Sequence, residues 1–413
     1  MKKASGRPVP RSFTAWAVVA ALGVSATASA YPFMIRRDYV ACSMCHADPS
    51  GGALLTAYGR ATGELLLRSQ YGAPADRDPG KLGNFMFGAF DLPENVLLGA
   101  DVRGMYMNSG PVGGDSTSRA FPMQLDAIAQ VSFWRIRGNG SIGYGQSNRT
   151  EPITLVHFDP NAQPAPGPQL VSRHNWLGID LGEDKQWLLR AGRMNLPFGL
   201  RSIEHTQWVR SETRTDTNIA QQHGIALAYT SAGLRGEVMA IAGNLVLRPA
   251  DYRELGYSGY VEYAPVTQFA LGVSSLITHA NLDVSTGAPM WRHAHGLFAR
   301  WSPTRMLVLS TEQDLTLFSQ PATVNLWGLA SLLVVDFEPY QGLHLLATGE
   351  ARSRGIGYYD TSFAGWGSLA WFFAPHADIR GDVIWSQIPD NISAPATVTN
   401  RSLTFLVQLH FFL

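Results

Sequence analysis

The chain ends with Ser402-Leu403-Thr404-Phe405-Leu406-Val407-Gln408-Leu409-His410-Phe411-Phe412-Leu413. Every odd-numbered position here is apolar, and Ser402, Thr404, Gln408 and His410 stand between them. Successive side chains of a β-strand point to opposite faces, so this alternation predicts a strand with one apolar and one polar face. Because a single strand is not stable in isolation, the rest of the chain should supply its partners.

The same period-two pattern recurs along the chain from about residue 94. It predicts an all-β protein, an antiparallel outer-membrane β-barrel of about 16 strands, because single-chain bacterial barrels have an even number of strands. The predicted strand cores are 96–107, 123–136, 139–146, 175–181, 187–194, 223–230, 235–243, 257–263, 269–278, 295–301, 307–317, 325–337, 343–351, 364–373, 378–387 and 402–412.

The composition agrees with a barrel at 94–413 that contacts membrane lipid. Charged residues make up only 15% of the chain, aromatic residues make up 11%, and there are 41 glycines. The net charge is zero, so the basic surface typical of nucleic-acid-binding proteins is missing. After the first 30 residues, no segment has the long uncharged apolar run of a transmembrane helix. If the protein spans a membrane, we expect it to do so with strands.

The predicted connections alternate in length, which orients the barrel. Short periplasmic turns and long extracellular loops produce such an alternation, which would place both termini on the periplasmic side. Charged residues on the polar faces should then line the lumen. The predicted tight turns are Arg137-Gly138, Ala232-Gly233, Pro303-Thr304 and Pro339-Tyr340, and the predicted long loops include 148–173, 200–222 and 389–400.

The N-terminus has the three parts of a secretory signal peptide. Lys2, Lys3, Arg7 and Arg11 form a basic start, 16–24 is apolar, and Ala28-Ser29-Ala30 offers a cleavage site. We therefore expect residues 1–30 to be removed on export. The mature chain would be mildly acidic, because the leader holds four of the 32 Lys and Arg residues.

The two cysteines of the chain stand in Cys42-Ser43-Met44-Cys45-His46, the C-x-x-C-H pattern of covalent c-type haem attachment. Two thiols one turn apart can form thioethers with the two haem vinyl groups, and the next residue, His46, would be an axial ligand of the iron. A buried pair or a redox dithiol needs no histidine after the second cysteine. The sequence therefore predicts one covalent haem c bound by Cys42, Cys45 and His46.

The residues around this motif suggest a short helical cytochrome segment over 31–71, followed by a linker over 72–93. Apolar residues recur at helical spacing between 54 and 66, and one face of this helix should cover the haem. Gly59 and Gly63 share a face, where they would let the backbone approach the porphyrin. Arg36 and Arg37 either pair with the haem propionates or form a solvated basic face.

Several of these residues carry a family resemblance. Pro32-Phe33 before the arginine pair, Tyr39, the C-x-x-C-H motif, Pro49, Leu55 and Tyr58-Gly59-Arg60 resemble the short cytochrome of the fused outer-membrane monohaem cytochrome-porins of iron-oxidising bacteria. The last residues, Phe411-Phe412-Leu413, also resemble the insertion signal of outer-membrane barrels. The resemblance implies electron transfer from extracellular Fe(II), or another redox donor, to a soluble periplasmic cytochrome, an iron(II):cytochrome c oxidoreductase activity.

The sixth ligand of the iron is not given by the motif. Met34 is the nearest candidate, with Met86 and histidines from the barrel as alternatives. Met44 lies inside the attachment loop and is interpreted as a filler residue. Donors for a pausing Fe(II) ion would be carboxylates and imidazoles in or beside the long loops. The candidates are His157, Asp159, His174, Glu204, His205, Asp216 and His223.

Three functions remain open from the sequence. In an electron conduit the haem segment must enter the lumen, because the apolar band of a barrel is about 25 Å tall. In a solute porin the haem segment would be a gate or plug, and the lumen would open. A barrel with an incidental C-x-x-C-H would carry no haem. Outward electron transfer to an extracellular acceptor is an alternative direction of the conduit.

Overall fold

The computed structural model describes residues 31–52, 54–71, 78, 81, 84–147, 167–202, 204, 206–246, 249–321, 325–356, 360–389 and 399–413. The predicted leader and ten of the 22 residues of the predicted linker (72–77, 79–80 and 82–83) lie outside these residues. No helix in the described ranges is long and apolar enough to cross a membrane.

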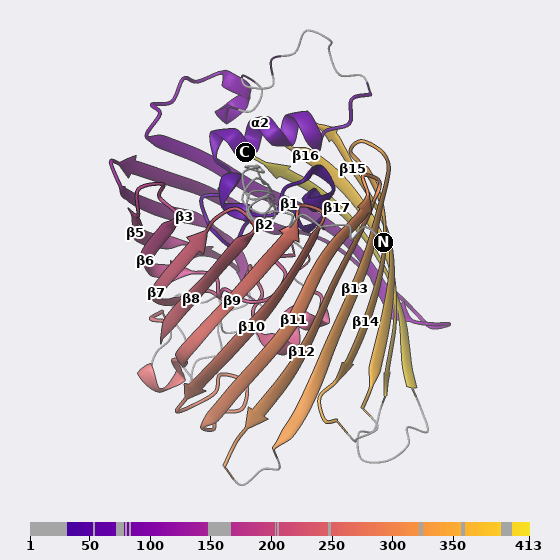
Figure 1. Ribbon diagram of the computed structural model, residues 1–413. Helices are drawn as coiled ribbons and strands as arrows, with labels where there is room; N and C mark the ends of the chain where they lie inside the picture. Colours follow the sequence, from indigo (N-terminus) through magenta and orange to yellow (C-terminus); the bar gives the residue numbers. More distant parts are fainter. Residues whose placement is uncertain are drawn as a thin grey trace, which may run out of the picture.

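The described strands form one antiparallel sheet that closes on itself (Figure 1). The first strand pairs with the last from Asp101 opposite Phe412 to Pro111 opposite Ser402. The strands are β1 (Val96–Pro111), β2 (Thr117–Phe133), β3 (Ile136–Ser147), β4 (Gly167–Val171), β5 (Asn175–Leu181), β6 (Trp187–Met194), β7 (Gln222–Thr230), β8 (Leu234–Gly243), β9 (Leu255–Val266), β10 (Phe269–Ala280), β11 (Met290–Thr304), β12 (Leu307–Ser319), β13 (Leu326–Tyr340), β14 (Leu343–Ser353), β15 (Ser362–Ala374), β16 (Ala377–Pro389) and β17 (Thr399–Phe412).

The barrel has 16 strands around its circumference, as predicted. The short β4 and β5 both pair with β3 and follow one another along it, so they are two parts of one interrupted strand. Each of the 16 predicted cores overlaps an observed strand. Only β4 was not predicted, since its residues fell within an expected long loop.

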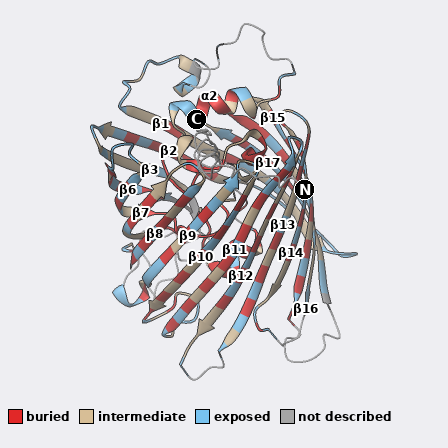
Figure 2. Ribbon diagram, viewed as in Figure 1, coloured by how far each residue is buried: buried red, intermediate tan, exposed pale blue. Residues whose placement is uncertain are grey.

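Buried and exposed residues alternate along the strands (Figure 2). In β8 the buried Arg235, Glu237 and Met239 alternate with the exposed Leu234 and Val238. Apolar side chains therefore face outward and polar side chains face inward, the arrangement of a membrane barrel. The predicted lumen charges are confirmed, and they are joined in ion pairs such as Arg300 to Glu262 at 2.6 Å and Arg380 to Asp382 at 2.8 Å.

The connections alternate in length as predicted, although three of the four tight turns are misplaced by two or three residues. The turn after β2 is at Trp134 and Arg135, because Trp134 takes the left-handed conformation (φ 55°), while Arg137 and Gly138 lie in β3. Likewise, 303–304 and 339–340 are strand, and the turns follow them. We call the end of the barrel with these tight turns the short-turn end. The start of β1 and the C-terminus of the chain lie next to each other at this end.

The N-terminal segment, residues 31–69, lies in and across the short-turn end. It contains η1 (Pro32–Arg37), η2 (Cys42–Met44) and α2 (Ala57–Leu66), and Figure 1 shows α2 lying across the mouth of the barrel. Ile35 and Val40 pack on Ala270 and Val308 of the barrel wall. The Ser69 amide donates to the Phe372 carbonyl at 2.8 Å. These contacts hold the segment against the inner side of the barrel mouth.

α2 does not present the predicted face. Its N-terminus is capped by Thr56, whose hydroxyl oxygen accepts from the Gly59 amide at 3.0 Å. The predicted apolar positions Tyr58 and Leu65 are exposed, whereas Arg60 and Glu64 are buried. The tertiary contacts of the barrel mouth thus override the apolar periodicity of the isolated helix.

The described residues of 195–221 (195–202, 204 and 206–221), here called the inward loop, fold back into the lumen. The loop contains α4 (Trp208–Thr213), which packs on β12, β13 and β14, with Val209 against Ala330 and Leu332. Arg352 pairs with Glu212 at 2.6 Å. Most of this segment was predicted as an extracellular loop, but its charges find partners on the inner wall. Among the described residues, η3 (Phe85–Gly88) and η5 (Ala250–Tyr252) also lie in connecting segments.

Candidate functional site

A cavity of about 1160 Å³, partly open to solvent, lies between the N-terminal segment and the inward loop. Cys45 and His46 line it on one side, and Arg201 and Asn218 of the inward loop on another. The barrel wall completes it, with apolar groups such as Ile128 from β2.

The C-x-x-C-H motif forms η2 and the residues directly after it. Both cysteines are buried and form no disulfide. The Cys45 and His46 amides donate to the Cys42 carbonyl at 3.2 and 3.0 Å, which places the two thiols one turn apart. Cys45 lines the cavity, but the Cys42 Sγ accepts from the Arg235 guanidinium at 2.7 Å and is not among the lining residues. Attachment through Cys42 therefore requires its side chain to leave Arg235.

The ring of His46 is oriented by a backbone contact. Its Nδ1 lies 2.9 Å from the Gly52 carbonyl oxygen, and a carbonyl can only accept, so Nδ1 carries the proton. In this tautomer Nε2 has the lone pair. Second-shell hydrogen bonds of this kind fix the orientation of metal-binding histidines. The geometry therefore suits His46 as an iron ligand through Nε2.

Two glycines of α2 line the cavity, as the sequence predicted. A Cβ added at Gly59 would lie 2.8 Å from the Cys45 Cα, so only glycine lets the helix pack against the attachment loop. At Gly63 the nearest atom to an added Cβ would be the Leu67 Cδ1 at 3.9 Å. Gly59 thus serves packing, while Gly63 leaves room on the cavity side.

Asp48 fixes the attachment loop to the barrel wall, a role that the sequence analysis missed. It accepts from Arg190 of β6 at 3.2 Å and from the Ser50 amide at 2.9 Å. Burial alone would raise the pKa of this carboxyl, but Arg190 and Arg201 outweigh burial and hold the pKa well below its usual range. Asp48 is therefore a buried carboxylate.

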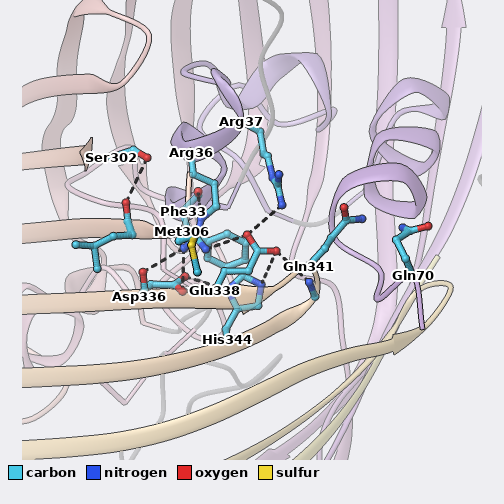
Figure 3. Close-up of polar contacts among 12 residues, drawn as sticks. Phe33, Arg36, Arg37, Gln70, Ser302, Met306, Asp336, Glu338, Gln341 and His344 are labelled. Carbon is cyan, nitrogen blue, oxygen red and sulfur yellow. Dashed lines mark hydrogen bonds and ion pairs between the residues drawn. The ribbon is translucent and has the colours of Figure 1, made fainter. Parts of the chain in front are cut away.

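Arg36 and Arg37 do not face the cavity. This corrects both predictions for the pair, namely contact with the haem propionates and a solvated basic face. Figure 3 shows them reaching acidic residues of the barrel wall. Arg36 is buried and pairs with Asp336 at 2.8 Å and Glu338 at 3.0 Å, and Arg37 pairs with Glu338 at 3.2 Å. The two arginines therefore anchor the N-terminal segment to β13.

Other cations line the cavity instead. Arg103 and Arg173 pair with Asp101 and Asp126. Arg60 and Arg201 also line it, and among the described residues neither has a carboxylate partner. Arg60 donates to the Leu98 carbonyl, and burial lowers its pKa to about 10. Arg201 donates to the Ser50 hydroxyl and the Leu196 carbonyl.

Two barrel histidines, His174 and His410, line the same cavity, and both are buried. His410 is held between two carboxylates, with Nδ1 2.9 Å from Asp378 and Nε2 3.2 Å from Asp101. His174 lies between β4 and β5 instead.

Met34 and Met86, the predicted candidates for the sixth ligand, are placed elsewhere. Met34 is buried against Leu67 and Phe372 and is not among the lining residues. Met86 is exposed in η3, outside the cavity.

The candidate Fe(II) residues of the long loops do not assemble. His157, Asp159 and His205 lie outside the described residues. Glu204 pairs with Arg380 at 2.5 Å inside the barrel, and His223 accepts from the Leu245 amide at 3.1 Å. Asp216 accepts from the Asn218 amide at 2.7 Å. Within the described ranges, no group of three or more His, Cys, Asp or Glu residues is placed to hold a metal ion.

The residues of the cavity fit a c-type haem. The site offers two thiols one turn apart, a histidine whose ring orientation is fixed and whose Nε2 carries the lone pair, and two glycines in α2. Apolar side chains suit the porphyrin, and the guanidinium groups of Arg60 and Arg201 match the geometry of propionate carboxylates. The misfit is Cys42, whose Sγ contacts Arg235 and does not line the cavity.

Comparison with known proteins supports the barrel fold but supplies no relative for the cavity. No protein-family model and no curated protein matches the sequence. Solved structures match the fold over about three quarters of the chain. They include OmpT of Vibrio cholerae lacking loop L8 (TM-score 0.57, 8% identity, 77% of this chain and 99% of that one) and the anion-selective porin of Comamonas acidovorans (0.55, 10%, 77% and 99%). OmpF of Salmonella typhi, in complex with daunomycin, is a third (0.54, 11%, 76% and 97%). This chain therefore has the fold of outer-membrane porins.

Proposed function

We propose that this protein is an outer-membrane electron conduit, in which a porin-like barrel holds one covalent c-type haem and passes electrons from extracellular Fe(II) to a soluble periplasmic cytochrome. The observation that carries the proposal is the position of the C-x-x-C-H motif. Cys45 and His46 line a partly open cavity inside the mouth of the barrel. The short-turn end, where this cavity lies, is the periplasmic end in barrels of this class.

The residues of the site have separate tasks in this proposal. Cys42 and Cys45 supply the thiols for attachment, and His46 supplies the axial nitrogen. Arg60 and Arg201 supply charge for the propionates, and Asp48 keeps the attachment loop on β6. The haem would supply one-electron redox chemistry at this position. Because the cavity lies inside the barrel, it is closer to the extracellular side than a haem domain in the periplasm would be.

A second candidate is a porin for small solutes, gated or plugged by the haem segment. The porin-like fold and the position of the N-terminal segment across the barrel mouth favour it. In this alternative the segment would have to move to open the lumen. Outward electron transfer to an extracellular acceptor would use the same residues in the opposite direction.

The test uses the full-length, haem-loaded protein mixed with Fe(II) in a stopped-flow instrument, with the visible band of reduced haem as the readout. We expect rapid reduction, and then oxidation when a periplasmic cytochrome c is added. Cys42→Ser and His46→Ala should lose the signal while still migrating as folded barrels. An oxidised haem that Fe(II) leaves unchanged would contradict inward conduction from iron.

Conductance in a planar lipid bilayer separates the conduit from the porin. The conduit hypothesis predicts a low single-channel conductance, because the N-terminal segment and the inward loop occupy the lumen. Conductance typical of open porins, together with slow reduction by Fe(II), would favour the gated porin.

A further inference from the structure

We propose that His174, from the barrel wall, is the second axial ligand of the haem iron, opposite His46. The inference rests on the haem of the proposed function, but not on the electron donor, the acceptor or the direction of transfer. It assigns the sixth position to a residue 128 positions away from the attachment histidine, and on the barrel rather than on the cytochrome segment.

The backbone aims His174 inward through a β-bulge. Gly140 of β3 pairs with Asn175, and Gly143 pairs with Val171, so three residues on one strand face two on the other. The Arg173 and His174 amides both donate to the Ser141 Oγ, at 3.0 and 2.8 Å. A bulge breaks the alternation of side chains, and bulges commonly redirect a side chain beside a functional site. Here it buries two consecutive residues, Arg173 and His174, on the lumen side.

The ring of His174 has no structural task that would explain its burial. Within the part of the chain that the structure describes, no hydrogen bond or ion pair joins its ring nitrogens to another residue. Buried polar groups normally have a partner, so a ring without one at a cavity wall points to a ligand in the cavity. His410 is a useful contrast, because both of its nitrogens contact carboxylates.

The surroundings of His174 bring it near the attachment loop. Asp48, two residues after His46, pairs with Arg190 of β6, the strand that pairs with β5 beside His174. The same cavity is lined by His46 and His174. Iron bound by both imidazoles would tie the N-terminal segment to β4 and β5 of the wall. Ligation by two histidines should also give a lower reduction potential than ligation by His and Met.

The test is the ferric spectrum of the full-length haem-loaded protein, by visible absorption and electron paramagnetic resonance. We expect the low-spin signature of two histidine ligands in the wild type. His174→Ala should become high-spin, and added imidazole should restore the low-spin spectrum. Met34→Leu and His410→Gln are matched controls that should keep the wild-type spectrum.

A second variant, His174→Met, tests the inference even if His174→Ala fails to fold. His174→Met should produce the far-red charge-transfer band of Met ligation and a higher reduction potential. An unchanged spectrum in both His174 variants, or loss of the low-spin signal in Met34→Leu, would overturn the inference. A bis-histidine spectrum without reduction by Fe(II) would uphold this inference and contradict the proposed electron donor, whereas a wild type without haem would overturn both.

Discussion

The N-terminal segment meets the barrel in two different ways. On the η1 side both arginines are matched: Arg36 and Arg37 contact Asp336 and Glu338, and His344 lies 3.0 Å from Asp336. On the cavity side, the buried Arg60 and His174 and the half-buried Arg201 have no ion-pair partner among the described residues. The first side is complete as it stands. The second has the polar groups that a bound acidic, metal-containing ligand would satisfy.

This difference separates anchoring from binding. A buried charge without a partner destabilises a protein, because it loses its hydration and gains little in return. Such groups persist at functional sites, where the ligand supplies the partner. Substitutions on the η1 side should therefore change the stability of the segment on the barrel, and substitutions on the cavity side should act through the haem.

The largest effect is expected from Arg36→Met. The substitution leaves Asp336 and Glu338 buried beside fewer cations, and breaking a buried ion pair costs roughly 3–5 kcal/mol. We expect the N-terminal segment to detach from the barrel mouth at lower urea concentration. Protease sensitivity of the segment during a urea titration measures the change. Equal stability of the variant and the wild type would show that the η1 side is not the anchor.

A smaller loss is expected from Gly59→Ala, on the cavity side. The added Cβ would lie 2.8 Å from the Cys45 Cα, so α2 or the attachment loop must move. Overpacking of this kind costs about 1–3 kcal/mol. The fraction of purified protein that carries haem should fall, as measured by absorbance against protein content. The matched control is Gly63→Ala, where the nearest atom is 3.9 Å away and stability should be unchanged or higher by up to about 1 kcal/mol.

The barrel could be predicted from the sequence because its pattern is repeated. An alternation that recurs in strand after strand averages out local exceptions, so the number of strands and the lumen charges were correct. The turns were displaced by two or three residues because their positions depend on single residues. Trp134 adopts a left-handed conformation that nothing in its residue type predicts.

The site was predictable only where it is local in sequence. Cys42, Cys45, His46 and the two helix glycines follow from spacing alone. The pairing of Arg36 with Asp336 joins residues 300 positions apart, and Asp48 meets Arg190 across 142 positions. The bulge that turns His174 inward is one extra residue in a strand, which leaves no mark in the hydrophobic pattern. Contacts of this kind depend on the closure and register of the barrel.

The comparison is sharpened by Arg60→Met, for which opposite signs are expected with and without haem. In a Cys42→Ser/Cys45→Ser background the substitution removes a buried cation without a carboxylate partner, and stability should rise by about 1 kcal/mol. In the haem-loaded protein it would remove the proposed partner of a propionate, and stability should fall by a similar amount. Urea titrations of the four proteins give both values. The same sign in both backgrounds would remove Arg60 from the haem site.

The smallest effect is expected from Arg37→Gln, which shows how much of the anchor is due to burial. Arg36 and Arg37 are adjacent and contact the same Glu338 oxygen, but their side chains are 1% and 22% exposed. A partly exposed ion pair contributes only about 0–1 kcal/mol, because water screens it. The same urea and protease assay should therefore show a loss several times smaller than for Arg36→Met. If the two losses were equal, the anchor would depend on the charge at Glu338, and the burial of Arg36 would add nothing to it.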